Sequence, residues 1–156
     1  MAIRPKELPE KNENWAEADF QGHAKSVVTL KSGHTVIVDE PQRLGGSNEG
    51  PSPTGYLVAS LAGCTAVIVN RVARDMKLEI ESLKVKSTIV YSPRGIAGQE
   101  GYPSQPTEAA SEVWLRIGAV PGQREALKAV YFRCCPVENL PKAAGCRMAD
   151  TWHVNE

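Results

Sequence analysis

The sequence has no excess of charge of either sign: 18 Lys and Arg residues balance 18 Asp and Glu residues in a chain of 156. Binding to nucleic acid requires a basic face that displaces counterions from phosphate, so this balance argues against a nucleic-acid partner. The first fifteen residues contain no apolar stretch and no small-residue cleavage site. They predict a loosely ordered lead-in over residues 1–15 rather than a secretory signal, and we expect a cytoplasmic protein.

The sequence also lacks an apolar run of the length that a membrane crossing needs. Residues 55–69 are almost continuously apolar, but Asn70, Arg71 and Arg74 end the run. A membrane-spanning helix needs roughly 20 such residues. We therefore predict a buried core helix, no membrane partner and a single domain over residues 1–156.

Cysteine is sparse, and its spacing does not suit a metal site. The four cysteines include no C-x₂₋₄-C pair, which structural zinc sites usually present. A site made of Cys134, Cys135, Cys146 and His153 would lack this pattern, so we expect neither a metal nor a bound cofactor. A reducing compartment also disfavours a framework of structural disulfides. Catalysis and plain packing remain as the two uses of these cysteines.

The hydrophobic periods predict an α+β fold. Runs of β-branched residues predict strands over residues 21–30 and 34–39, and alternating apolar residues predict strands over 79–91 and 112–117. A last strand is predicted over residues 145–154. The first two strands are joined across Gly33, which indicates a hairpin. Ser52 and Pro53 have the residue types of a helix N-cap and first helical position, and a second helix is predicted over residues 122–133. Residues 91–106 are rich in Gly and Pro and are typical of a functional flap or a disordered tip.

Cys64 lies in the predicted core helix, on a stripe at three- and four-residue spacing formed by Leu57, Leu61, Cys64, Ile68 and Arg71. Burial raises the pKa of a cysteine, because the thiolate loses solvation, and only the thiolate attacks electrophiles. Cys64 therefore needs a nearby cation to be reactive. Arg43, in the loop that leads into this helix, is the candidate.

Cys135 stands directly before Pro136, which disfavours helical geometry at Cys135 and predicts that a new helix begins there. The field of that helix favours negative charge, so we expect a lowered pKa and a good leaving group. Pro141 is expected to limit this helix to little more than one turn.

Packing alone could also explain these residues. Cysteine often fills a core as a small hydrophobe. We assign Cys134 and Cys146 to packing. Arg43, if its position before the helix with Cys64 is left aside, would be a solvated loop residue. Cys64, among small residues, could simply mark a close helix crossing.

Together these features resemble the OsmC/Ohr family of thiol-dependent hydroperoxide reductases. The shared pattern runs from Pro53 and Leu57 to Cys64 after two small residues, and then to Cys-Pro-Val at residues 135–137. The resemblance implies antiparallel sheets packed around a long central helix that bears Cys64, in an intertwined homodimer. It also implies that Cys64 is the peroxidatic residue, Cys135 the resolving residue and Arg43 the activating arginine. An arginine typical of the Ohr branch would fall near Phe20 and is absent, so the OsmC branch fits better.

The implied function is reduction of an organic hydroperoxide through a Cys64 sulfenic acid and a Cys64–Cys135 disulfide, which an external dithiol reductant resets. Cys134 could compete with Cys135 as the resolving thiol. The chain departs from the family at Thr54, where a glutamate holds the arginine, and Glu49 is a candidate replacement. An OsmC-fold binding protein with structural thiols is therefore the alternative. A cysteine transferase or hydrolase would need a partnered histidine, for which the sequence offers no telling position.

Overall fold

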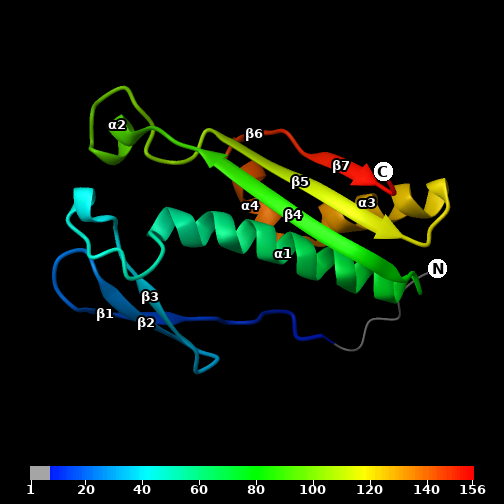
Figure 1. Cartoon of the computed structure of the whole chain (residues 1–156), viewed down its shortest axis with the longest axis horizontal. Helices are drawn as coiled ribbons and strands as arrows, with labels where there is room; N and C mark the ends of the chain where they lie inside the picture. Colours follow the sequence, from blue (N-terminus) through cyan, green and yellow to red (C-terminus); the bar gives the residue numbers. More distant parts are fainter. Residues whose placement is uncertain (1–7) are drawn as a thin grey trace. The chain divides into compact units, whose positions relative to one another are not determined.

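The computed structural model describes residues 8–156, and these residues form two compact units, one that ends at Leu57 and one from Val58 to Glu156. Most of the predicted lead-in is described, and residues 8–15 are exposed and without regular structure; residues 1–7 lie outside the described residues. Whether the chain folds as the single domain predicted above stays a prediction. Figure 1 labels the helices and strands in both units.

The N-terminal unit contains a three-stranded antiparallel sheet in the order β1-β2-β3, formed by β1 (Ala16–Phe20), β2 (Ser26–Leu30) and β3 (Thr35–Val38). The predicted hairpin is confirmed: Gly33 has φ +84°, and its N–H donates to the Leu30 carbonyl over 2.8 Å. β1 was missed because all five of its residues are exposed and give no alternating hydrophobic signal. A short 3₁₀ helix, η1 (Gln42–Leu44), follows in the predicted loop.

The long helix α1 (Pro53–Asp75) begins as predicted, because the Ser52 hydroxyl accepts a hydrogen bond of 3.1 Å from the Gly55 N–H. Its buried residues are Leu61, Thr65, Ile68, Val69, Val72 and Ala73. The predicted stripe is wrong at its ends, because Leu57 and Arg71 are exposed. With 23 residues and an 18-residue window of mean hydropathy 1.5, α1 reaches the length and composition of a membrane span, contrary to the prediction. One third of that window is buried, and the buried face of α1 joins the protein core.

The C-terminal unit is built on a four-stranded sheet centred on β5 (Glu108–Ile117). β4 (Ile80–Val90) pairs with it antiparallel, whereas β6 (Arg147–Met148) and β7 (Thr151–Val154) pair with it in parallel. The expected antiparallel sheets are therefore found in part, and this sheet is mixed. The predicted strand 145–154 is two strands, separated where the Asp150 carboxylate accepts a hydrogen bond of 2.8 Å from the Ser111 N–H.

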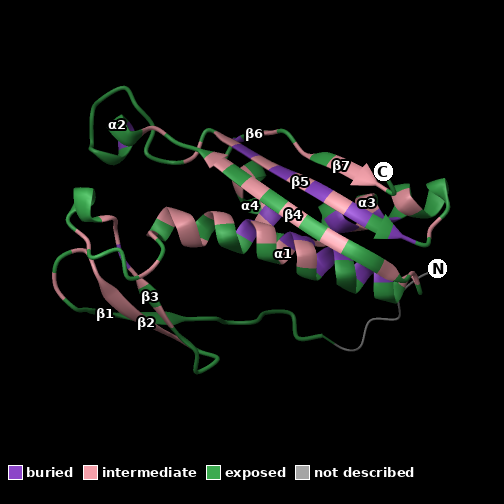
Figure 2. Cartoon of the chain, viewed as in Figure 1, coloured by how far each residue is buried: buried purple, intermediate pink, exposed green. Residues whose placement is uncertain are grey.

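Three further helices complete this unit: α2 (Pro93–Ile96), α3 (Pro121–Cys134) and α4 (Pro136–Ala143). The core gathers buried side chains from α1, β5 and α3, together with Cys135. Figure 2 shows these buried positions concentrated along β5 and one side of α1. The fold class is thus α+β, as predicted.

Leu127 on α3 offers a direct test of this core, because it is 1% exposed. We expect Leu127→Ala to lower the free energy of unfolding by about 2–5 kcal/mol, since it removes buried methyl groups and leaves a cavity. Urea denaturation measures this change. Leu44→Ala is the matched control: Leu44 is 59% exposed, and its replacement should cost less than about 0.5 kcal/mol. Equal effects for the two variants would contradict the assigned core.

Candidate functional site: a cysteine pair

Two cysteines that are 71 residues apart in the sequence meet in the C-terminal unit. The Cys135 thiol donates a hydrogen bond to the Cys64 sulfur, with 3.5 Å between the two Sγ atoms. Both cysteines are free thiols. A disulfide has an S–S length of about 2.05 Å, so a small movement would close the bond. The structure thus brings together two of the three predicted site residues, while their catalytic role stays a prediction.

Local sequence places Cys135 at the junction of two helices. Pro136 disfavours helical backbone at the residue before it, and Cys135 accordingly has φ −76° and ψ 108°. Cys135 ends α3, with its N–H donating to the Tyr131 carbonyl over 2.9 Å, and it is also the N-cap of α4. The expected limit at Pro141 is wrong: Pro141 lies inside α4, which has eight residues.

The expected lowering of the Cys135 pKa is also wrong. Cys135 is fully buried, and this burial raises its pKa to about 11. The backbone N–H groups of Glu138 and Val137 at the start of α4 act in the opposite direction, while the neighbouring Cys64 raises the pKa further. Loss of solvation therefore outweighs the field of a two-turn helix. At neutral pH Cys135 is a protonated thiol.

Cys64 sits at the edge of the buried face of α1 and is half-buried. The next residue, Thr65, is fully buried. This difference between neighbours places Cys64 where the core meets the surface of the helix. A half-buried thiol is accessible to a small reagent, as a reacting nucleophile must be.

Arg43, the third predicted site residue, belongs to the N-terminal unit. It lies exposed in η1, before Gly45 in a left-handed conformation with φ +86°. Among residues 8–156, no hydrogen bond or ion pair of its guanidinium is found. Glu49 does not take the place of the missing family glutamate within this loop, because its carboxylate pairs with Lys25 at 2.7 Å. The Thr54 hydroxyl lies 3.1 Å from that of Ser52.

Asp39 organises the loop that carries Arg43, and the sequence reasoning missed it. Its carboxylate accepts hydrogen bonds of 2.8–3.2 Å from the backbone N–H groups of Glu40, Ser47 and Glu49. These hydrogen bonds, that from Glu49 foremost, lower the pKa of Asp39. The stabilisation is therefore present at neutral pH and is lost as the pH falls through the lowered pKa. An aspartate before a Gly-, Ser- and Asn-rich stretch was the available signal.

The other two cysteines have the surroundings of packing residues. The Cys146 thiol is buried and donates to the Pro106 carbonyl over 3.0 Å. Cys134 is half-buried and borders the core. Within the described part of the chain, no three His, Cys, Asp or Glu side chains are arranged to hold a metal ion.

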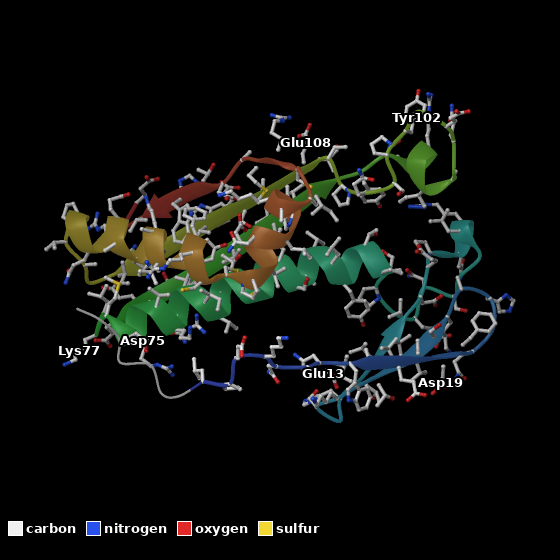
Figure 3. All side chains as sticks on the ribbon, turned by 180° about the vertical axis from the view of Figure 1, so that it is seen from behind. Glu13, Asp19, Asp75, Lys77, Tyr102 and Glu108 are labelled. Carbon is white, nitrogen blue, oxygen red and sulfur yellow. The ribbon has the colours of Figure 1, made fainter. Side chains whose placement is uncertain are left out.

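The predicted flap at residues 91–106 contains the short helix α2 and is internally bonded. The Arg94 guanidinium donates to the Tyr102 hydroxyl over 2.6 Å and lies 5.1 Å from the centre of its ring. Figure 3 shows Tyr102 at the outer side of this loop. Gly95 is required there, since a Cβ at this position would collide with the Pro103 carbonyl.

A family model identifies the family, and solved structures share the fold. The family model of OsmC-like proteins matches residues 46–146. An OsmC-like protein of Mycoplasma pneumoniae is 15% identical, with 96% of this chain and all of that chain covered and a TM-score of 0.74. An organic hydroperoxide resistance protein OsmC of Legionella pneumophila is 19% identical, with coverage of 93% and 98% and a TM-score of 0.61. One from Elizabethkingia anophelis is 17% identical, with coverage of 95% and 100% and a TM-score of 0.66. No curated protein sequence matches the chain.

Fold and site together define an α+β protein with a close pair of free thiols, one of which lies on a long helix. The family match covers more than half of the residues. The chain belongs to the OsmC-like family. Its place in the OsmC rather than the Ohr branch stays a prediction.

Proposed function

We propose that the protein is a thiol-dependent peroxidase that reduces organic hydroperoxides. The observation that carries the proposal is the 3.5 Å separation of the Cys64 and Cys135 sulfur atoms. Membership of the OsmC-like family supports it, as does the similarity to proteins named for organic hydroperoxide resistance. The apolar surroundings of Cys64 on α1 favour an organic substrate over hydrogen peroxide.

In the proposed cycle, the Cys64 thiolate attacks one oxygen of the hydroperoxide, the O–O bond breaks, and the alkoxide leaves and takes up a proton to give an alcohol. Cys64 is thereby oxidised to a sulfenic acid. The Cys135 sulfur then attacks the Cys64 sulfur, the S–S bond forms and the hydroxyl group leaves. An external dithiol supplies two electrons and two protons that restore both thiols.

The protonated state of Cys135 fits its part in this cycle. Because its pKa is raised to about 11, Cys135 does not compete with Cys64 for the hydroperoxide at neutral pH. Its thiol proton is released as the sulfur attacks the sulfenic acid, and the departing hydroxyl group takes up a proton to become water. Arg43 is proposed to stabilise the Cys64 thiolate and the charge that develops on the peroxide oxygens.

The proposed partners are the hydroperoxide, a dithiol reductant and a second copy of the chain, in the cytoplasm and without nucleic acid or membrane. Exposed apolar side chains in the C-terminal unit support the homodimer. Val67 on α1 is 65% exposed and Leu140 on α4 is 61% exposed. A partner that covered them would remove this apolar area from water.

Mass spectrometry with thiol mapping tests the proposed cycle directly. After one equivalent of cumene hydroperoxide, the reduced protein is expected to lose two hydrogen atoms and to contain a Cys64–Cys135 disulfide. Cys146, which is buried against the Pro106 carbonyl, should remain a free thiol and serves as the internal control. A chain that stays fully reduced would refute the peroxidase proposal.

A binding protein with structural thiols is the second candidate, and the loop before α1 favours it. Glu49 is engaged by Lys25, and Thr54 stands where the family has its glutamate, so the described contacts include no carboxylate holding Arg43. A hollow of about 380 Å³ beside α3 is lined in equal number by charged residues, Arg124, Glu125, Lys128 and Glu156, and by uncharged residues that include Trp152 and Val154. The four charged side chains do not suit a wholly apolar ligand. A co-purifying ligand with both thiols unreactive would support this candidate.

A further inference from the structure

The sulfur atoms of Cys64 and Cys135 lie at a separation that one further atom can bridge. Their Sγ atoms are 3.5 Å apart, and both residues are free thiols. This contact is the one hydrogen bond between two sulfur atoms found among residues 8–156. Two thiols held this close can act as a chelate, because an atom bonded to the first sulfur meets the second without further ordering of the chain.

The separation of the two sulfurs selects the geometry of the bridging atom. With two bonds of about 2.3 Å, the length of a bond from zinc to a thiolate, sulfurs 3.5 Å apart subtend an angle of about 99° at the atom between them. That angle suits a trivalent arsenic atom, whose lone pair narrows the angles between its three bonds. A soft ion held in line between two thiolates, such as Cu(I), would need the sulfurs about 4.6 Å apart at the same bond length.

The number of ligands that the protein offers also favours arsenic over a four-coordinate metal. Zinc in a structural site takes four protein ligands in a tetrahedron. No group of three His, Cys, Asp or Glu side chains that could hold a metal ion occurs over residues 8–156. An arsenic atom that carries one organic substituent needs only two sulfurs, because the substituent occupies its third bond. The cysteine pair supplies that number.

The unequal burial of the two thiols sets the order in which the bonds form. Cys64 is half-buried at the edge of α1, whereas Cys135 is fully buried. A reagent that arrives from solvent therefore reaches Cys64 first, and Cys135 reacts only with an atom that is already attached to Cys64. A reagent that forms a single bond to sulfur modifies Cys64 alone, whereas an arsenical engages both thiols.

We propose that the Cys64–Cys135 pair is a binding site for a trivalent arsenical that carries one organic substituent. The arsenic atom is bonded to both sulfurs, and its substituent lies on the accessible side of Cys64. The proposal rests on the separation and burial of the sulfurs and not on the proposed peroxidase activity. It has one consequence for that activity: a bound arsenical occupies both reacting thiols and inhibits the proposed cycle.

The binding step balances without an oxidant or a reductant. Phenylarsine oxide in its hydrated form carries two hydroxyl groups on arsenic. Each As–O bond breaks as an As–S bond forms, and the hydroxyl group leaves with the thiol proton as water. Two thiols and one arsenical therefore give one adduct and two molecules of water, and arsenic stays trivalent. Because burial raises the pKa of Cys135 to about 11, its thiol carries the proton that this step uses.

Binding of phenylarsine oxide to the reduced protein tests the site without any hydroperoxide. One equivalent should add one phenylarsenic group in place of two hydrogen atoms, as measured by intact mass, and should protect Cys64 from alkylation by iodoacetamide. Excess β-mercaptoethanol should leave the adduct in place, because a monothiol competes poorly with a chelate. Dimercaptopropanol, which is itself a dithiol, should release the arsenical.

Serine variants show whether the two sulfurs act together. Cys64→Ser and Cys135→Ser should each weaken binding by about 10²–10⁴-fold, the gain that a second linked contact supplies. Cys134→Ser is the matched control, because it removes the adjacent half-buried thiol and should bind as the wild type does. Zinc at the same concentration should leave the amount of adduct unchanged.

Three results would overturn the proposal. The first is an adduct that β-mercaptoethanol removes from the wild type as easily as from Cys64→Ser, because the sulfurs would then not act together. The second is wild-type affinity in Cys64→Ser, which would place the arsenic on other thiols such as Cys134. The third is loss of the adduct in the presence of zinc, which would show that the pair prefers a metal ion. If Cys135→Ser does not fold, Cys64→Ser decides alone. None of these measurements uses peroxidase activity, so the two proposals can fail separately.

Discussion

Cys64→Ser is expected to abolish turnover of cumene hydroperoxide, with kcat/KM reduced by about 10³-fold or more. A serine hydroxyl does not ionise near neutral pH and cannot form a sulfenic acid, so the first step of the cycle has no nucleophile. Consumption of cumene hydroperoxide and of hydrogen peroxide by the wild type and the variant, with dithiothreitol as the reductant, measures the effect. The wild type should prefer the organic substrate.

Cys135→Ser distinguishes the two sulfurs. This variant should consume one equivalent of hydroperoxide and then slow sharply, because Cys64 can still be oxidised but has no partner for a disulfide. Cys134→Ser is the matched control, since it removes the adjacent half-buried thiol and should leave turnover unchanged. Full turnover in Cys135→Ser that is lost when Cys134→Ser is added would mean that Cys134 resolves the sulfenic acid. Activity retained in Cys64→Ser would contradict the assigned nucleophile.

Arg43→Ala is expected to lower kcat/KM at pH 7 by about 10²-fold, the usual effect of removing one group that stabilises transition-state charge. The loss should shrink as the pH rises, because hydroxide then removes the thiol proton of Cys64 without help from a cation. The kcat/KM of Arg43→Lys should lie between those of the wild type and Arg43→Ala, since an ammonium keeps the charge but not the planar pair of donors. The test is the pH profile of kcat/KM, measured for the wild type and for both Arg43 variants.

Arg116→Ala controls for a general loss of positive charge, because Arg116 is an exposed arginine on β5. It should retain wild-type kinetics. An Arg43→Ala variant as active as the wild type at every pH would contradict the role of Arg43. If the Cys64–Cys135 disulfide still formed, that result would mean that the thiol pair reacts without help from Arg43. The presence of Thr54, in place of the glutamate that holds the arginine in the family, would be consistent with that result.

The parts of the fold that depend on local signals could be predicted from the sequence. Ser52 and Pro53 predicted the start of α1, and Gly33 predicted the hairpin turn. Pro136 predicted the new helix after Cys135. These predictions succeeded because caps and turns depend on neighbouring residues. The exposed strand β1 carried no apolar alternation and was missed. The parallel pairing of β6 and β7 with β5 depends on contacts between distant segments, which no local pattern encodes.

The candidate site divides in the same way. The sequence by itself determined which sulfurs to consider, because residue type and helix spacing are local properties. Only the tertiary structure decided that they lie 3.5 Å apart and that Cys135 is protonated, since the solvation lost by its thiol depends on the core packed around it. The hydrogen bonds of Tyr131 on α3 with Thr65 on α1 and with Glu138 on α4 likewise exist only after three helices have come together, because each of the two joins residues from different elements.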